Sequence, residues 1–168
     1  MNRSYTFFRY LAYSLEILLA YILIGIPGLV PELFGSKPCV LLCIGVTIAF
    51  FEREITAMVF GLICGLLTDT GYGNNFCFFA AAMMVFCFFI AYFAENIMVT
   101  NLPVIWTTTF IIVLVTVSTQ FLFSYLLKGY GEPGTYFLNH YVSRIVYTTL
   151  LTPIFYGLNR LFTNLLYD

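Results

Sequence analysis

Six long apolar runs follow one another along the chain, separated by short breaks that contain glycine, proline, asparagine or charged residues. The runs cover residues 7–26, 39–51, 55–68, 76–94, 102–127 and 137–162. A helix needs roughly 20 apolar residues to cross the hydrocarbon core of a bilayer, and the fourth and fifth runs meet this length easily. The shorter second and third runs either recruit flanking residues or form a re-entrant hairpin. The pattern predicts an all-α, polytopic transmembrane helical bundle of about six spans, the second and third short, in a single integral membrane domain over residues 1–168.

The composition favours the bilayer as the solvent of this chain. Hydrophobic residues make up 61% of the sequence and charged residues 9%, whereas soluble domains carry about 25% charged residues. The formal net charge is −1 and like charges do not cluster, which argues against a nucleic-acid surface. All five cysteines lie inside apolar runs without a CxxC motif, so we interpret them as small buried hydrophobic residues.

Positively charged residues are distributed unequally between the two predicted faces. If the N-terminus lies in the cytoplasm, four arginines fall on the cytoplasmic side and two lysines on the outside. This bias follows the positive-inside rule and predicts that both termini are cytoplasmic. The residues concerned are Arg3, Arg9, Arg53 and Arg160 on the inside, and Lys37 and Lys128 on the outside.

The stretch TDTGYGN at residues 68–74 is similar to the loop that lines potassium pores. In such a filter a threonine occupies the place of Asp69, and the backbone carbonyls of four copies coordinate the ion. A carboxylate at this position argues against a filter. We interpret the stretch as a turn between helices, in which Gly71 and Gly73 adopt positive φ angles.

Small residues spaced four apart precede this stretch. Gly61 and Gly65 share one helix face, and such a spacing lets another helix approach closely in lipid. Asp69 follows on the same face at the C-terminal end of the predicted helix, where the helix dipole disfavours negative charge. We therefore predict a partner for the Asp69 carboxylate and a helix-packing or partner interface made by Gly61, Gly65, Asp69, Gly71 and Gly73.

This glycine- and aspartate-containing pattern resembles the signature of the MreD family, the rod-shape-determining integral membrane proteins of bacteria. The matching residues are Gly61, Gly65, Leu66, Leu67, Asp69 and Gly73. The likeness covers residues 35–98 well, the last 25 residues loosely and the fifth run only by hydropathy. Residues 74–77 depart from the family, which commonly has a small or glycine-rich step there.

The resemblance implies a non-enzymatic scaffold of the lateral cell-wall elongation machinery in the bacterial inner membrane, without a cofactor. It also implies three sets of partners: MreC, the RodA glycosyltransferase with its class B penicillin-binding protein, and the actin-like MreB. The sequence agrees in that we find no catalytic motif, and the one histidine, His140, has no metal-ligand spacing around it.

Three polar residues fall inside predicted spans: Glu16, Gln120 and Arg144. Such residues are costly in lipid and usually face the bundle interior or a water-filled cavity. For Glu16 a functional role and a single interhelical hydrogen bond explain the residue equally well. Arg144 and Asp69 both fall near the outer face, so we predict that they pair or share one polar site. The rival interpretation is that Arg144 reaches toward the lipid headgroups.

An alternative function is the substrate-binding component of an energy-coupling-factor vitamin transporter, which has a similar size and span number. Glu16 and Arg144 would suit a polar ligand. Such components commonly carry small residues four apart in the first span, and here Ala12, Leu15, Glu16 and Ala20 reproduce this spacing only in part.

Overall fold

The computed structural model describes residues 3–26, 38–72, 77–96, 101–122 and 141–165. Gly73, Lys37, Lys128 and His140 lie outside these ranges. The described residues form no strand and fold into the helices α1 (Arg3–Gly25), α2 (Val40–Phe51), α3 (Glu54–Tyr72), α4 (Phe78–Asn96), α5 (Leu102–Phe121) and α7 (Ser143–Leu165). The prediction of an all-α bundle is confirmed.

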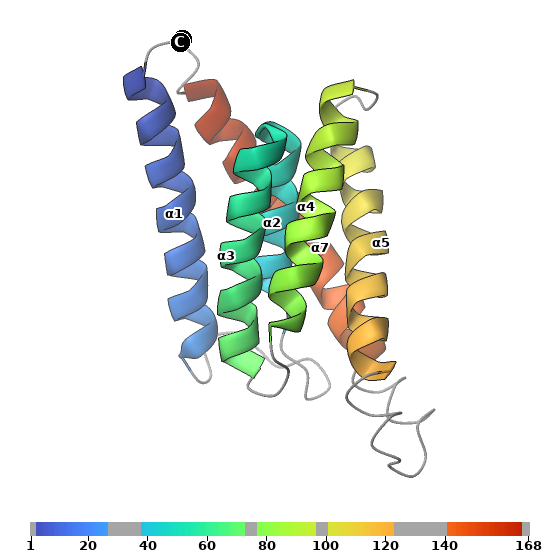
Figure 1. The fold of residues 1–168 in the computed structure, drawn as a ribbon. Coiled ribbons are helices and arrows are strands. Elements are labelled where there is room, and N and C mark those ends of the chain that lie inside the picture. The colour runs from blue at the N-terminus through green and yellow to red at the C-terminus, as the bar shows by residue number, and fades with distance from the viewer. Residues whose placement is uncertain (1–2, 27–37, 73–76, 97–100, 123–140, 166–168) are drawn as a thin grey trace.

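Successive helices run in opposite directions, so that α1 begins and α7 ends at the same end of the bundle (Figure 1). We call this the Arg9 end, because Arg9 of α1 lies there beside Glu52 in the connection between α2 and α3. The opposite end, called the Asp69 end, holds the last turn of α3 and the start of α4.

The short helix α2 forms the centre of the molecule. Every residue from Val40 to Phe50 is buried, and α2 packs against α1, α3, α4, α5 and α7. Its 12 residues extend about 18 Å at 1.5 Å per residue, less than the roughly 30 Å of a bilayer core. The second run is therefore short because it forms a core helix surrounded by the others.

The third helix is longer than the apolar run that predicted it. α3 has 19 residues, because the helix continues through Thr68–Tyr72. Our interpretation of residues 68–74 as a turn is therefore wrong for this part, and Gly71 lies in the last helical turn. Residues 68–72 form the end of a helix and not a loop, so they are not arranged as an ion filter either. Gly73 and Asn74 lie outside the described residues.

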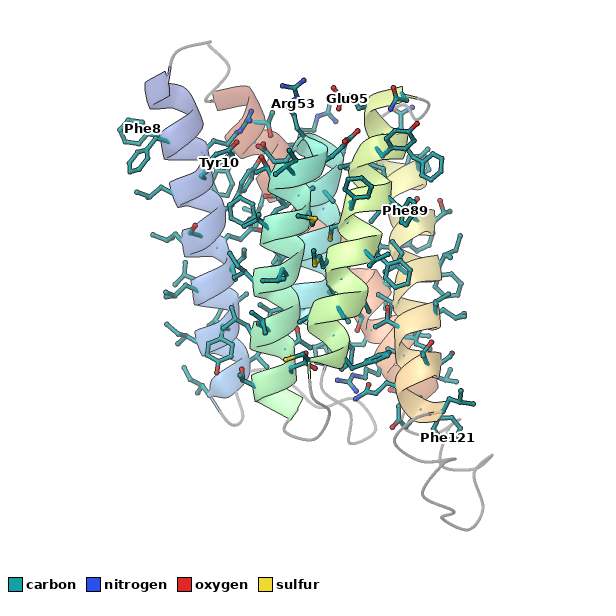
Figure 2. The ribbon with its side chains drawn as sticks, viewed as in Figure 1. Phe8, Tyr10, Arg53, Phe89, Glu95 and Phe121 are labelled. Atoms are coloured by element: carbon teal, nitrogen blue, oxygen red, sulfur yellow. The ribbon has the colours of Figure 1, made fainter. Side chains whose placement is uncertain are left out.

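Large apolar side chains cover the outside of the bundle. Phe8 of α1 points away from the neighbouring helices (Figure 2) and is 57% exposed, and Phe89 of α4 is 50% exposed. Soluble monomers rarely expose such surfaces over a wide area. By length and composition three of the described helices could cross a membrane: Phe7–Gly25, Phe78–Asn96 and Leu102–Phe121.

Candidate functional site

The glycine face of α3 packs directly on the backbone of α4. A Cβ atom on Gly65 would lie 2.4 Å from the Cα atom of Ala80, and one on Gly61 would lie 2.8 Å from the carbonyl oxygen of Met83. Neither neighbour is a flexible side-chain tip that could move aside. We call this contact the α3–α4 seam. The face predicted for an internal or a partner helix is therefore covered by α4 of the same chain.

Asp69 closes the α3–α4 seam at its end. Its carboxylate oxygens accept hydrogen bonds from the backbone N–H groups of Phe79, at 3.2 Å, and Ala80, at 3.0 Å. These are the second and third residues of α4, the positions that an N-cap side chain normally satisfies. Cys77, the residue before α4, has a φ angle of 49°. Asp69 on α3 thus caps the N-terminus of the neighbouring helix α4. The positive end of the α4 dipole stabilises the negative charge of the Asp69 carboxylate.

The predicted pairing of Asp69 with Arg144 is wrong. The Arg144 guanidinium is buried, and its Nε donates to the Cys39 sulfur at 3.0 Å while Nη1 donates to Gln120 Oε1 at 3.4 Å. Nothing in the sequence favoured the α4 backbone as the partner of Asp69, because nearly every residue carries a backbone N–H group. The structure instead brings together two of the predicted polar residues, Arg144 of α7 and Gln120 of α5.

A row of polar contacts joins α2 to α7. The Cys39 N–H donates to Thr148 Oγ1 at 3.0 Å, the Cys43 thiol donates to the Thr148 carbonyl at 3.0 Å, and Asn159 Nδ2 donates to Thr47 Oγ1 at 2.9 Å. We did not predict this row, although cysteine and threonine recur every fourth residue on α2. The sulfur atoms of Cys39, Cys43 and Cys87 therefore take part in hydrogen bonds. Cys77 is exposed, so its predicted burial is wrong.

Pro153 lies inside α7 and lacks the N–H that would bond the carbonyl of Thr149, four residues earlier. The indole Nε1 of Trp106 on α5 donates to that carbonyl at 3.0 Å. The proline therefore creates an acceptor that fixes α5 against α7.

One buried ion pair fastens α1 at the Arg9 end. Arg9 Nη2 donates to Glu52 Oε2 at 3.0 Å, and the Glu52 side chain is 1% exposed. Burial raises the pKa of the Glu52 carboxyl, and the positive charge of Arg9 opposes this shift. The hydroxyl groups of Tyr10 and Thr56 lie 3.3 Å apart and add a second link, consistent with Tyr10 pointing toward the bundle (Figure 2).

A groove of about 580 Å³ separates α1 from α7 over most of their length, with Val40 of α2 among its walls. We call it the α1/α7 groove. Glu16 lines it and is 8% exposed. Both Glu16 carboxylate oxygens are buried and accept no hydrogen bond from any described residue. The other walls are apolar apart from Tyr147, and they include Ala12, Leu15, Leu19, Leu151 and Phe155.

Neither the metal-ligating residues that the structure describes nor the comparison with known proteins identifies a site in this chain. Among the described residues, no three His, Cys, Asp or Glu side chains come together in a way that could hold a metal ion. The chain matches no protein-family model, no curated protein and no solved structure. The candidate site is therefore defined by its geometry, and its most unusual feature is the unpartnered Glu16 in an apolar groove.

Proposed function

We propose that this chain is a multi-pass protein of the bacterial inner membrane and a non-enzymatic scaffold of the lateral cell-wall elongation machinery. The observation that carries the proposal is the MreD-like pattern of Gly61, Gly65 and Asp69. In this chain these residues act together, since the glycines admit the α4 backbone and the aspartate caps α4. The three residues of the pattern build one helix contact, and a sequence pattern with a structural role of this kind is what a protein family retains.

The proposed partners follow from the resemblance alone: MreC, RodA with its class B penicillin-binding protein, and MreB. A scaffold in lipid binds its partners through helix faces that its own helices leave uncovered. The outer face of α1 and the α1/α7 groove fit this requirement, because large apolar side chains on them are exposed.

The cellular role is tested by deleting the gene in its host and by purifying the tagged protein from native membranes. We expect the deletion to convert rod-shaped cells into rounded ones, and MreC and RodA to co-purify with the tagged chain. Cells that stay rod-shaped without the protein, together with a purification free of both partners, would contradict the proposal.

The proposed orientation places both termini in the cytoplasm, because arginines predominate on that side and the helices alternate in direction. In a chain whose native cysteines are replaced, cysteines introduced at Lys37 and Lys128 should react with an impermeant reagent added outside the cell. Reaction from the cytoplasmic side only would reverse the orientation.

A second candidate function is the capture of a small molecule, as in an energy-coupling-factor transporter. It is favoured by the α1/α7 groove, whose 580 Å³ lies within the roughly 300–1,000 Å³ common for ligand pockets. Co-purification of ATPase and coupling subunits in place of MreC and RodA would favour this candidate.

A further inference from the structure

We propose that the α1/α7 groove is the docking site for a transmembrane helix of a partner protein, and that this helix carries a hydrogen-bond donor near its midpoint that binds Glu16. This inference rests on the part of the proposed function that places the bundle in a membrane. It assigns to the scaffold one specific surface and to the partner one specific chemical feature.

The position of Glu16 sets the depth of the expected contact. The apolar span of α1 runs over the 19 residues Phe7–Gly25, and Glu16 is the tenth of them. A carboxyl group at the middle of a span is far from both headgroup layers, so water and headgroups do not serve it as partners. Its two oxygens are covered and receive no hydrogen bond from the described residues. Leaving such a group unsatisfied is unfavourable, so a binding partner that supplies a donor is selected for.

The shape of the groove favours a helix over a small molecule. The lining residues extend from Ala12 to Ile24 on α1, a rise of about 18 Å along the helix axis. The groove is also open at its side, since Leu15, Leu19 and Leu158 are 54%, 50% and 40% exposed. A pocket for a small ligand usually covers about 70–90% of the ligand surface, whereas a helix lying in a groove keeps its other face outward.

The chemistry of the groove excludes a lipid tail as the specific occupant. An acyl chain can fill the apolar walls formed by residues such as Leu151 and Phe155. An acyl chain offers no hydrogen-bond donor to Glu16, so the carboxyl would still lack a partner, as it does among the described residues of the free chain. A glutamate side chain has several rotatable bonds, so the carboxyl can turn from its covered position toward a donor that arrives in the groove.

A designed peptide tests the proposal without knowledge of the natural partner. The probe is a transmembrane helix of about 20 leucine and alanine residues with a single central lysine, and its control has leucine in place of the lysine. Energy transfer between the labelled peptide and the labelled full chain in vesicles reports binding. We expect the lysine peptide to bind the wild-type chain about three- to tenfold more tightly than its control, as interhelical hydrogen bonds in lipid predict.

Three variants assign the binding to the groove. Glu16→Leu should remove the difference between the two peptides, and Glu16→Gln should retain part of it. Leu19→Trp should weaken both peptides, because the indole fills the groove. Leu18→Trp is the matched control, since Leu18 is 56% exposed but does not line the groove, and it should change nothing.

Several results would overturn the inference. Equal binding of the two peptides by the wild-type chain would show that Glu16 does not recognise a donor. Efficient disulfide formation between two copies of a Leu19→Cys chain, absent from Leu18→Cys, would make a second copy the occupant. A small molecule found by native mass spectrometry, and lost in Leu19→Trp only, would favour a ligand pocket.

The peptide result is separable from the cell-wall role. If the peptides behave as expected and cells without the chain remain rod-shaped, the docking groove stands and the proposed cellular function fails. If MreC and RodA co-purify with the Leu19→Trp chain as they do with the wild type, and the peptides bind alike, the cellular function stands and this docking site is rejected.

Discussion

The α3–α4 seam and the α1/α7 groove show two opposite ways of placing helices side by side. In the seam, Gly61 and Gly65 bring the backbones into contact and Asp69 satisfies two N–H groups of α4. In the groove, apolar side chains of α1 and α7 face each other across an open space, and the Glu16 carboxyl has no hydrogen-bond partner among the described residues.

The two interfaces show which contacts complete the fold and which leave a surface open for binding. Lipid is as apolar as leucine, so helices in a membrane gain little from burying leucine against leucine and depend on close packing and polar contacts. The seam has both features within the chain. The groove has neither, although α1 is fastened at the Arg9 end by the pair of Arg9 and Glu52. The α1/α7 groove is therefore a suitable binding surface, because α1 is held in place at the Arg9 end while its contact with α7 stays open.

The largest expected effect comes from filling the α3–α4 seam. Gly65→Leu should destabilise the protein by more than about 3 kcal/mol, because backbone atoms of α4 stand where the side chain would begin. Gly157→Leu is the matched control, since a Cβ at Gly157 meets nothing within 4 Å. Unfolding in mixed micelles measures both variants. Equal stability of the two would show that the glycine spacing is incidental.

Breaking the fastening of α1 should have the next largest effect. Arg9→Met should cost about 2 kcal/mol, because it leaves the Glu52 carboxylate buried without its cation. The loss is smaller than the roughly 3–5 kcal/mol of a fully buried pair, since the Arg9 side chain is 15% exposed. The double variant Arg9→Met with Glu52→Gln should recover part of this loss, since no unpaired charge remains. The same unfolding assay checks both variants, and a double variant less stable than Arg9→Met would argue against a simple ion pair.

Removing the cap of α4 should have a smaller effect. Asp69→Ala should cost about 1 kcal/mol, the usual loss for an N-cap side chain, and Asp69→Asn should cost less because its amide oxygen still accepts. The exchanged pair Asp69→Arg with Arg144→Asp should recover nothing, because the two wild-type residues bind different groups. Recovery in that exchange would restore the pairing that the structure contradicts.

The sequence predicted the parts of this molecule that depend on local pattern. Apolar run length is enough to predict helices and their alternation, and the spacing of Gly61 and Gly65 is enough to predict a close helix contact. The unusual placement of Asp69 at a helix C-terminus correctly implied that its carboxylate has a partner. The length of α3 was underestimated, because threonine, aspartate and glycine are common in turns as well as at helix ends.

The remaining features depend on contacts between residues far apart in the chain. Asp69 binds the backbone of α4, and backbone N–H groups leave no mark in the sequence, so a charged residue such as Arg144 was the more visible partner. The acceptor of Trp106 is a carbonyl that Pro153 leaves free on another helix. The α1/α7 groove results from how two helices at opposite ends of the chain meet. In the sequence only Glu16 inside an apolar run and the partial small-residue spacing of Ala12 and Ala20 pointed to it.

An effect of similar size to that of Asp69→Ala, and the only one with the opposite sign, is expected at Glu16. Glu16→Leu should stabilise the isolated chain by about 1 kcal/mol, because it removes a buried carboxyl that no described residue satisfies. Leucine also matches the apolar walls of the groove. Glu16→Gln should stabilise less, since a buried amide without partners remains. If Glu16→Leu gains stability and binds the lysine peptide more weakly, Glu16 serves recognition of a partner although it lowers the stability of the fold. If Glu16→Leu instead destabilises the chain, the carboxyl contributes to the fold, and the contrast between the finished seam and the open groove no longer holds.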